Sequence, residues 1–134
     1  GIECRRCGGD GALIDWRRAV PLLQAALDAE KPRPLWRVED VYAAVRDGSA
    51  HLLQSDNAVM VVTSPDPYPT GEVVMEAWLV GGRLDEVLAM VPALEQRARF
   101  SGCTIAQVVG RAGWVKTLAP HGYKQEAIIL RKQL

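Results

Sequence analysis

The stretch that decides the fold spans residues 72–100, and its first part reads Glu72, Val73-Val74-Met75-Glu76-Ala77-Trp78-Leu79-Val80, Gly81-Gly82. β-branched and bulky residues with a single interior charge are typical of a central strand that is covered on both faces. We therefore expect residues 73–80 to form the middle strand of a sheet. The glycine pair is expected to end that strand in a tight turn.

A helix and a second strand are predicted directly after the glycines. Apolar residues recur at helical spacing up to residue 100, and Gly102 supplies a C-terminal stop. The apolar positions are Leu84, Val87, Leu88, Val91, Leu94 and Ala98. Residues 104–109 then form the second strand. A helical crossover between two strands of one sheet predicts that the strands lie parallel.

Length and composition indicate one compact domain. The chain has 134 residues, 49% of them hydrophobic, which suffices for one core and not for two ordinary domains. We expect residues 12–134 to form this domain and residues 1–11 to be a flexible N-terminal leader. Without a run of 18 apolar residues or an apolar signal core, the sequence predicts a soluble protein of a reducing compartment, with no membrane partner.

The charges are balanced overall but not along the chain. Residues 51–96 hold seven acids and one base, whereas residues 97–134 hold seven bases and one acid. Either the two segments pair across the sheet, or the basic segment forms a face for an anionic partner. Because the basic segment lacks interleaved aromatic residues that stack bases, nucleic acid is not the expected partner.

The leader contains Cys4-Arg5-Arg6-Cys7-Gly8-Gly9, which is similar to half of a zinc knuckle. Zinc needs four ligands. The other candidates, Cys103, His51 and His121, fall in different predicted elements without paired spacing. We expect no metal site.

The remaining elements follow from periodicity and turn residues. We expect a helix from Asp15 to Glu30, with Pro21 favouring a start near Ala19, and a second helix that ends at Asp47. Residues 50–53 and 58–63 should pair as antiparallel strands, and the proline-rich residues 64–69 should form a loop. A short helix to Leu118 and a last strand from Tyr123 to Leu130 complete the chain.

This order of elements resembles the GCN5-related N-acetyltransferase (GNAT) fold, and more closely that of small phage and prophage proteins with the fold. The residues that carry the closer resemblance are Glu39-Asp40-Val41, Gly48-Ser49-Ala50, Tyr68-Pro69, Trp78-Leu79, Gly81-Gly82, Leu84-Asp85-Glu86, Pro92-Ala93-Leu94-Glu95, Ala98, Gly102-Cys103, Gly110-Arg111-Ala112-Gly113-Trp114, Leu118 and Gly122-Tyr123. The resemblance implies an α+β protein with three α/β/α layers. Its sheet would be mixed and mostly antiparallel, with a central parallel pair of strands.

In such an acetyltransferase, the turn after the central strand wraps the pyrophosphate of acetyl-coenzyme A. The resemblance implies that Leu79, Val80, Gly81, Gly82 and Arg83 would contact this cofactor if it binds. The family pattern, Arg or Gln, two residues, Gly, one residue, Gly or Ala, is not met by the adjacent glycines. Asp85 and Glu86 in the first helical turn would also repel a diphosphate. We therefore expect no cofactor, with acetyl-coenzyme A as the cofactor if the protein is an enzyme.

Catalytic residues are sparse. Glu76 is a candidate general base if it faces a cleft, although it could equally reach solvent or pair with an arginine. In the family that this sequence resembles, a tyrosine on the last helix protonates the leaving thiolate. That tyrosine has no match here, because the last helix contains Val115, Lys116 and Thr117 instead. The turn from Gly110 to Trp114 either binds an anion through Arg111 or serves as a tight turn in which Trp114 fills the core.

These observations support three hypotheses. The first is a phage- or prophage-encoded protein that has lost acetyl-coenzyme A chemistry and has a structural, assembly or virion-associated role. Its partners would be phage or other proteins, with self-association as a further option, and its location the bacterial host cytoplasm or the virion. The second is an acetyl-coenzyme A-dependent N-acetyltransferase, and the third a nucleic-acid-binding module.

Overall fold

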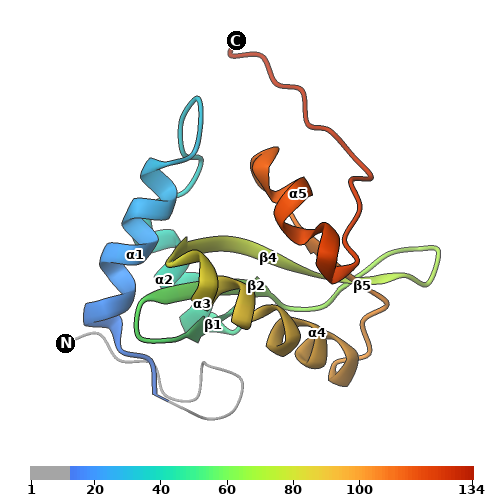
Figure 1. The fold of residues 1–134 in the computed structure, drawn as a ribbon, viewed down its shortest axis with the longest axis horizontal. Helices are drawn as coiled ribbons and strands as arrows, with labels where there is room; N and C mark the ends of the chain where they lie inside the picture. The colour runs from blue at the N-terminus through green and yellow to red at the C-terminus, as the bar shows by residue number, and fades with distance from the viewer. Residues whose placement is uncertain (1–12) are drawn as a thin grey trace.

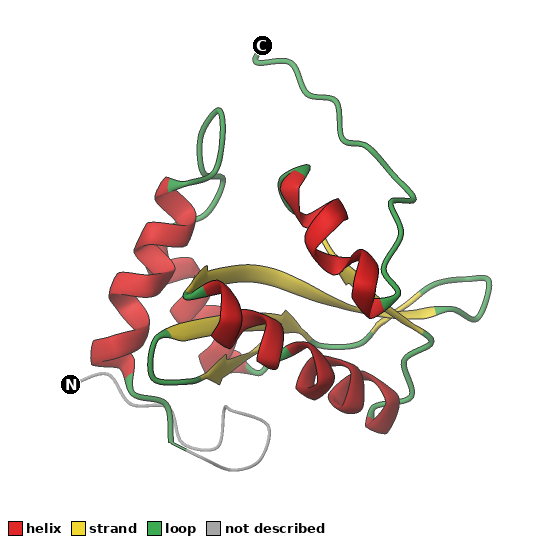
Figure 2. Ribbon diagram, viewed as in Figure 1, coloured by secondary structure: helices red, strands yellow, loops and turns green. Residues whose placement is uncertain are grey.

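A computed structural model describes residues 13–134. Five α-helices and five strands follow one another in this part of the chain (Figures 1 and 2). In order, they are α1 (Trp16–Asp28), α2 (Val38–Asp47), β1 (Ala50–Gln54), β2 (Ala58–Thr63), β3 (Asp66–Pro67), β4 (Val73–Gly82), α3 (Leu84–Ala89), α4 (Val91–Phe100), β5 (Ile105–Val108), α5 (Gly113–Leu118) and a 3₁₀ turn, η1 (Ala119–His121).

The sheet is built around β4. Its strand order is β1-β2-β4-β3, and β5 pairs with the other edge of β4. β1, β2 and β3 all pair antiparallel, whereas β4 and β5 lie parallel, with Val74 opposite Ile105 and Ala77 opposite Val108. The predicted mixed sheet with a central parallel pair is confirmed, as is the antiparallel pairing of β1 and β2.

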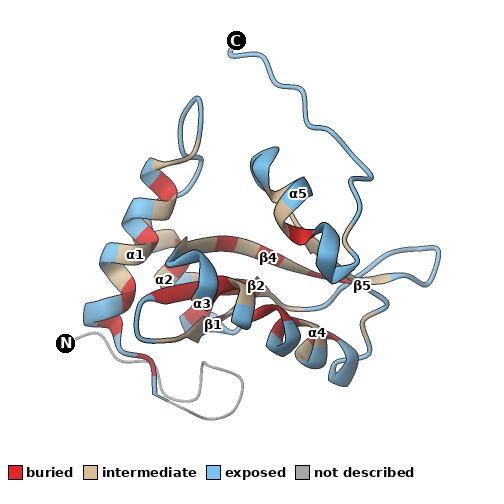
Figure 3. Ribbon diagram, in the orientation of Figure 1, coloured by how far each residue is buried: buried red, intermediate tan, exposed pale blue. Residues whose placement is uncertain are grey.

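Helices cover both faces of the sheet, which gives the three expected layers. α1 and α2 pack on one face, where Leu23, Val41 and Val61 lie in the same buried cluster. α3 and α4 pack on the other face around Met60 and Leu94. Figure 3 shows the buried positions along the strands and along the inner sides of the helices. β4 is therefore covered on both faces, as its apolar sequence predicts.

An irregularity in β4 at Trp78 separates the two halves of the strand. Val61 lies opposite Leu79, but its neighbour Val62 lies opposite Ala77, so Trp78 is an extra residue in the ladder. Such a bulge changes the alternation of side chains. Ala77 contributes to the core under α3 and α4, whereas Leu79 contributes to the core under α1 and α2. The pairing with β5 also stops at Ala77, directly before the bulge.

Two boundaries around this strand differ from those expected. The glycine pair does not end the strand, because Gly81 and Gly82 pair with Val59 and Ala58 of β2. The single helix predicted for residues 84–100 is two helices that meet at Met90. Pro92 has no N–H to donate to the carbonyl of Leu88, so the first helix cannot continue through it.

The first helix begins as predicted from Asp15, which caps α1 by accepting a hydrogen bond from the Arg18 N–H. The alternative start near Ala19 is wrong, and Pro21 lies inside the helix. The proline-rich loop contains the short strand β3, in which Asp66 lies opposite Val74. A two-residue strand at an edge tolerates proline, since one side of it makes no ladder bonds.

The last predicted strand is absent. Residues 124–134 are exposed and form no helix or strand, so the predicted strand from Tyr123 to Leu130 has no partner in the sheet. Figure 1 shows this segment running away from the body of the protein, past α5. The predicted leader, residues 1–11, lies outside the described residues. Within residues 13–134, no helix is long and apolar enough to span a membrane.

The core under α3 and α4 can be tested with two substitutions in one helix. Leu94 is fully buried, so Leu94→Ala should lower the free energy of unfolding by about 2 to 5 kcal/mol. Phe100 is 94% exposed, and Phe100→Ala should change it by no more than about 0.5 kcal/mol. Urea unfolding followed by circular dichroism measures both. Equal losses would show that α4 is not packed as described.

Candidate functional site

The turn after β4 holds the residues that were predicted to contact a cofactor, and its two glycines are explained by packing. A Cβ at Gly81 would lie 2.6 Å from the carbonyl oxygen of Leu22 in α1. A Cβ at Gly82, where φ is +105°, would lie 2.1 Å from the carbonyl oxygen of Asn57. Both distances are shorter than any real contact of a Cβ. The glycines thus let α1 and the β1–β2 hairpin approach β4 closely.

Arg83 and Asp85 form a bidentate ion pair at the start of α3. The Arg83 guanidinium donates from Nε and Nη2 to the two carboxylate oxygens of Asp85, at 3.1 and 3.0 Å. The pKa of Asp85 is lowered, chiefly by this hydrogen bond and further by the positive charge of Arg83 and by the backbone N–H groups of Glu86 and Asp85. The carboxylate of Asp85 therefore lies at the N-terminus of α3, the end of the helix whose dipole attracts anions.

Glu86 ties the same turn to the β1–β2 hairpin. Its Oε1 accepts hydrogen bonds from the Ser55 hydroxyl at 2.6 Å and from the Asn57 N–H at 2.8 Å, and its Oε2 accepts one from the Asn57 side-chain amide at 2.9 Å. These donors favour the ionised form and lower the pKa of Glu86, the Ser55 hydroxyl most of all. Only 23% of the Glu86 side chain is exposed, so its carboxylate mainly contacts groups of the protein itself.

The charged groups at this turn are engaged with one another. Two carboxylates lie in the first turn of α3, and the only arginine at the turn is already engaged with them. The Arg83 N–H donates to the carbonyl of Asn57 at 2.9 Å, so it is not available to a ligand. α3 has six residues, and its dipole is correspondingly weak.

The five residues predicted to contact a cofactor occupy different environments. The side chain of Leu79 is buried in the core under α1 and α2, and that of Val80 packs against the core under α3 and α4. Gly81 lies against α1, Gly82 lies against the hairpin, and Arg83 is exposed at the start of α3. Their contact with acetyl-coenzyme A stays a prediction.

Glu76 lies beside a cavity of about 310 Å³ between β3, β4 and β5. The cavity is lined by Thr63, Ser64, Pro65, Asp66, Tyr68, Val74, Glu76 and Gln107. The Gln107 amide donates to Glu76 Oε1 at 2.6 Å. Among residues 13–134, Glu76 has no arginine in ion-pair contact, and it is only partly exposed. The Gln107 bond leaves its second carboxylate oxygen for another partner.

α5 contains no tyrosine. Its side chains that carry a polar hydrogen are Trp114, Lys116 and Thr117, and the Thr117 hydroxyl donates to the Gly113 carbonyl at 3.1 Å. The indole of Trp114 packs over Gly110, where a Cβ would lie 2.8 Å from Trp114 Cδ1, and against the core under α3 and α4. This supports the interpretation of residues 110–114 as a tight turn with a core-filling tryptophan.

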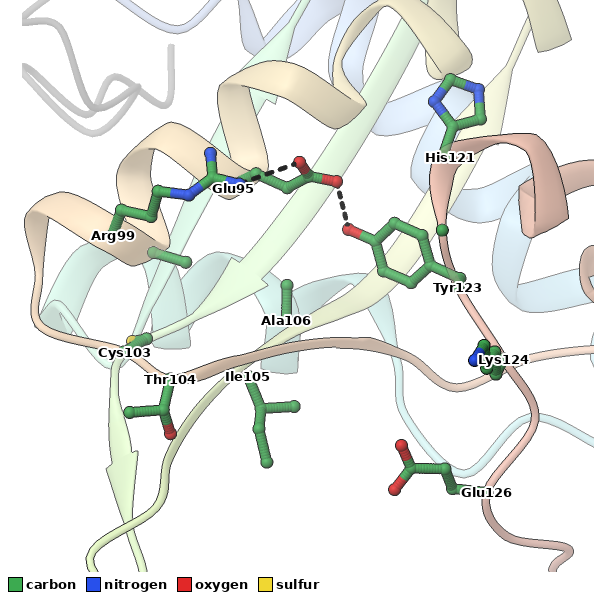
Figure 4. A pocket seen from close by; sticks show the side chains of 12 residues that line it. Glu95, Arg99, Cys103, Thr104, Ile105, Ala106, His121, Tyr123, Lys124 and Glu126 are labelled. Carbon is green, nitrogen blue, oxygen red and sulfur yellow. Dashed lines mark hydrogen bonds and ion pairs between the residues drawn. The ribbon is translucent and has the colours of Figure 1, made fainter.

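A larger cavity, of about 470 Å³, was not predicted from the sequence (Figure 4). It lies between α4, β5 and residues 121–126. The Tyr123 hydroxyl donates to Glu95 Oε2 at 2.9 Å, and Arg99 pairs with Glu95 Oε1 at 3.6 Å. Burial and the Glu95 carboxylate raise the pKa of Tyr123. Tyr123 and Glu95 are 28 residues apart, so spacing along the chain gives no sign of this contact.

No metal site is formed by the described residues: residues 13–134 contain no group of three or more His, Cys, Asp or Glu side chains placed to hold an ion. Cys103 is a free thiol, and burial raises its pKa. Cys4 and Cys7 lie outside the described residues, so the expectation that they bind no metal stays a prediction.

Known structures share this architecture. The chain superposes on a transcriptional regulator from Bacillus halodurans C-125 with a TM-score of 0.66 and 16% identity, over 99% of both chains. On an acetyltransferase from Trypanosoma brucei the TM-score is 0.65 at 15% identity, over 90% of this chain and 93% of that one. On a ribosomal-protein-alanine N-acetyltransferase from Brucella melitensis it is 0.60 at 15% identity, over 90% and 92%.

The protein therefore has the GNAT fold, and the predicted fold class is confirmed. At these identities the likeness concerns the fold and not the activity. No protein-family model and no curated protein matches the sequence.

The packing role of the glycine pair predicts a specific loss of stability. Gly82→Ala should lower the free energy of unfolding by about 2 kcal/mol or more, because it combines an unfavourable positive φ with a clash against backbone. Gly102→Ala is the matched control, since Gly102 also has a positive φ, +79°, but open space where the Cβ would be. It should cost about 1 kcal/mol. Equal losses in denaturant titrations would argue against the close approach of the hairpin.

The bonds of Glu86 predict how stability depends on pH. A carboxylate whose pKa is lower in the folded than in the unfolded state stabilises the fold above its unfolded value, 4.5, and this contribution is lost as the pH falls through the folded value. Glu86→Gln should therefore be less stable than wild type at pH 7, and the difference should shrink as the pH falls below about 4.5. Thermal melts of both proteins across this range provide the measurement. A difference that is independent of pH would contradict the assignment.

Proposed function

We propose that this protein uses the GNAT fold as a scaffold for binding other proteins and does not transfer acetyl groups from acetyl-coenzyme A. The observation that carries the proposal is the placement of Asp85 and Glu86 in the first turn of α3, where both carboxylates are held by hydrogen bonds from the protein itself. A diphosphate would have to displace the Asp85 carboxylate from Arg83 and remain beside Glu86.

The side chains of α5, which include no tyrosine and no carboxyl group, support the same proposal. Release of a thiolate requires a group that can protonate it, within hydrogen-bond reach of the sulfur. The Thr117 hydroxyl is committed to the Gly113 carbonyl, and Lys116 is exposed. The Tyr123 hydroxyl donates to Glu95 at the cavity between α4, β5 and residues 121–126.

The resemblance of residues 12–134 to small phage and prophage proteins extends the proposal. In this form the protein is encoded by a phage or prophage, binds other phage proteins during assembly or in the virion, and resides in the bacterial host cytoplasm or in the particle. Mass spectrometry of purified particles, released after induction of a host that carries the gene, tests this part. If the protein is absent from particles and from assembly intermediates, the proposed phage role is contradicted, but the proposed scaffold role is not.

An acetyl-coenzyme A-dependent N-acetyltransferase is the second candidate, and the geometry of β4 favours it in one respect. β4 and β5 stop pairing after Ala77, at the bulge, so residues 78–82 have no strand partner on that edge. Glu76 lies just before this point, beside the cavity of about 310 Å³, where a general base could meet an amine. In this alternative, Leu79, Val80, Gly81, Gly82 and Arg83 contact the cofactor.

A titration with acetyl-coenzyme A separates the two candidates. We expect isothermal titration calorimetry to show no binding to the wild-type protein at low micromolar concentration. Asp85→Ser should strengthen any weak binding, because it removes one carboxylate and frees Arg83 while leaving Glu86 to hold the hairpin. Asp85→Glu, which keeps the charge, is the matched control and should bind no better than wild type.

Tight binding of acetyl-coenzyme A would contradict the proposal. A wild-type dissociation constant below about 10 μM, with loss of affinity in Arg83→Ala, would show that the turn accepts the diphosphate. The acetyltransferase would then be the better supported function, and Glu76→Gln should abolish acetyl transfer without loss of binding.

A further inference from the structure

Glu76 is the one charge inside the apolar run of β4, and it lies on a face of the strand that the helices leave open. Met75 and Ala77 belong to the core under α3 and α4. Because side chains alternate along a strand, Val74 and Glu76 face the other side of the sheet. α1 and α2 pack on that side, but none of the residues that line the cavity of about 310 Å³ comes from either helix. We call this opening the Glu76 cavity.

Two carboxylates border the Glu76 cavity. Asp66 of β3 lies directly opposite Val74 of β4, so their side chains share a face of the sheet, and Glu76 is the next residue of β4 on that face. Asp66 and Glu76 both line the cavity, whereas no Lys, Arg or His does. Within residues 13–134, neither carboxylate has an ion-pair partner. The cavity therefore presents two negative charges that the described part of the chain does not neutralise.

The uncharged polar groups around the cavity mainly offer acceptors for hydrogen bonds. The Gln107 side-chain amide donates to Glu76 Oε1 at 2.6 Å, which leaves the Gln107 carbonyl oxygen and Glu76 Oε2 for other donors. The Ser64 hydroxyl donates to the Gly48 carbonyl at 2.6 Å, so toward the cavity it can only accept. The Thr63 hydroxyl oxygen accepts from the Glu76 N–H at 3.0 Å. A ligand that suits this set carries a positive charge and several N–H donors.

Tyr68 gives the cavity an aromatic wall on a loop that is fixed by backbone hydrogen bonds. The Tyr68 N–H donates to the Glu72 carbonyl at 2.8 Å, and the Gly71 N–H donates to the Tyr68 carbonyl at 3.0 Å. Tyr68 is 49% exposed, so its ring is open to a ligand in the cavity. Cations bind to aromatic rings, and arginine does so more often than lysine. Pro65 and Val74 add apolar surface that methylene groups of a long side chain can cover.

We propose that the Glu76 cavity binds the guanidinium group of an arginine side chain that belongs to a partner protein. The inference rests on the proposed scaffold function and identifies where that scaffold holds its partner. A guanidinium carries five N–H donors in one plane, which suits two carboxylates and the Gln107 carbonyl better than the three donors of an ammonium group. Its pKa lies above about 12, so it stays protonated and is a ligand here, not an acceptor of acetyl groups.

The position and charge of the cavity favour an arginine in a protein over free arginine. The β3–β4 loop beside it projects from the sheet at the end where β5 begins, within reach of another protein (Figure 1). Free arginine carries a carboxylate of its own, which Asp66 and Glu76 would repel, whereas an arginine inside a polypeptide has none. Arginine is also enriched among the residues that contribute most of the binding energy at protein interfaces.

The first test compares arginine with a neutral side chain of the same shape. A tripeptide with arginine between two glycines and with blocked ends should shift the NMR signal of the Gln107 side-chain amide, with a dissociation constant of about 1 mM. The same peptide with citrulline, which lacks the charge, should bind at least about tenfold more weakly, and that with lysine at least about threefold more weakly. Equal binding of the citrulline or the lysine peptide, or no shift at about 10 mM arginine peptide, would overturn the proposal.

The second test removes the carboxylates. Glu76→Gln and Asp66→Asn keep the shape of each side chain, and each should raise the dissociation constant of the arginine peptide at least about fivefold. Glu126→Gln is the matched control, because it removes an exposed carboxylate at the larger cavity and should leave binding unchanged. Wild-type affinity in Glu76→Gln, or an equal loss in all three variants, would show that the peptide binds elsewhere and would refute the site.

The last test separates a protein partner from a small molecule. Free arginine should bind at least about threefold more weakly than the blocked tripeptide, because of its own carboxylate. Equal or tighter binding of free arginine would assign the cavity to a small molecule and contradict the protein partner. Acetyl-coenzyme A is absent from all these samples. Failure to bind arginine therefore refutes this inference alone, whereas the titration with acetyl-coenzyme A decides the proposed function.

Discussion

One extra residue in β4 determines how the rest of the structure is arranged. The bulge at Trp78 lets Ala77 and Leu79 serve cores on opposite faces of the sheet, and it coincides with the end of the β4–β5 pairing. Without it, the strand would keep a strict alternation and the parallel pair could continue to the glycines. Trp78 is held in place by an edge-to-face contact with Trp36, at a centroid distance of 5.2 Å.

Much of this architecture could be predicted because local patterns in the sequence indicate it. The apolar run of residues 73–80, the helical spacing up to Ala98 and the stop at Gly102 define a parallel crossover, and the structure contains one. The break at Pro92 was also predictable, since proline lacks an N–H, but the strong apolar spacing on both sides concealed it. The strand expected from Tyr123 shows the limit of such patterns. Propensity indicates what a segment favours and not whether a neighbouring strand is there to pair with it.

The candidate site was harder to predict, because its residues meet through contacts distant in the sequence. Glu86 reaches Ser55 and Asn57, and Tyr123 reaches Glu95. The glycines after β4 illustrate how one motif can serve two purposes. In sequence they stand at the position of the family's phosphate-binding turn without its spacing, whereas in the structure their missing side chains admit the carbonyls of Leu22 and Asn57. A close backbone neighbour in the same protein leaves the same signature as a bound ligand.

The hydrogen bonds of Glu86 also have a consequence for how the chain folds. α3 has six residues, far fewer than the dozen or so that an isolated helix needs to persist in water. Its first turn is completed by Ser55 and Asn57, which take up their positions only when the β1–β2 hairpin has formed. Hairpin and helix should therefore gain and lose structure together, as one cooperative unit, with amide protons in both exchanging at a common rate. The turn after β4 thus joins the β1–β2 hairpin to α3.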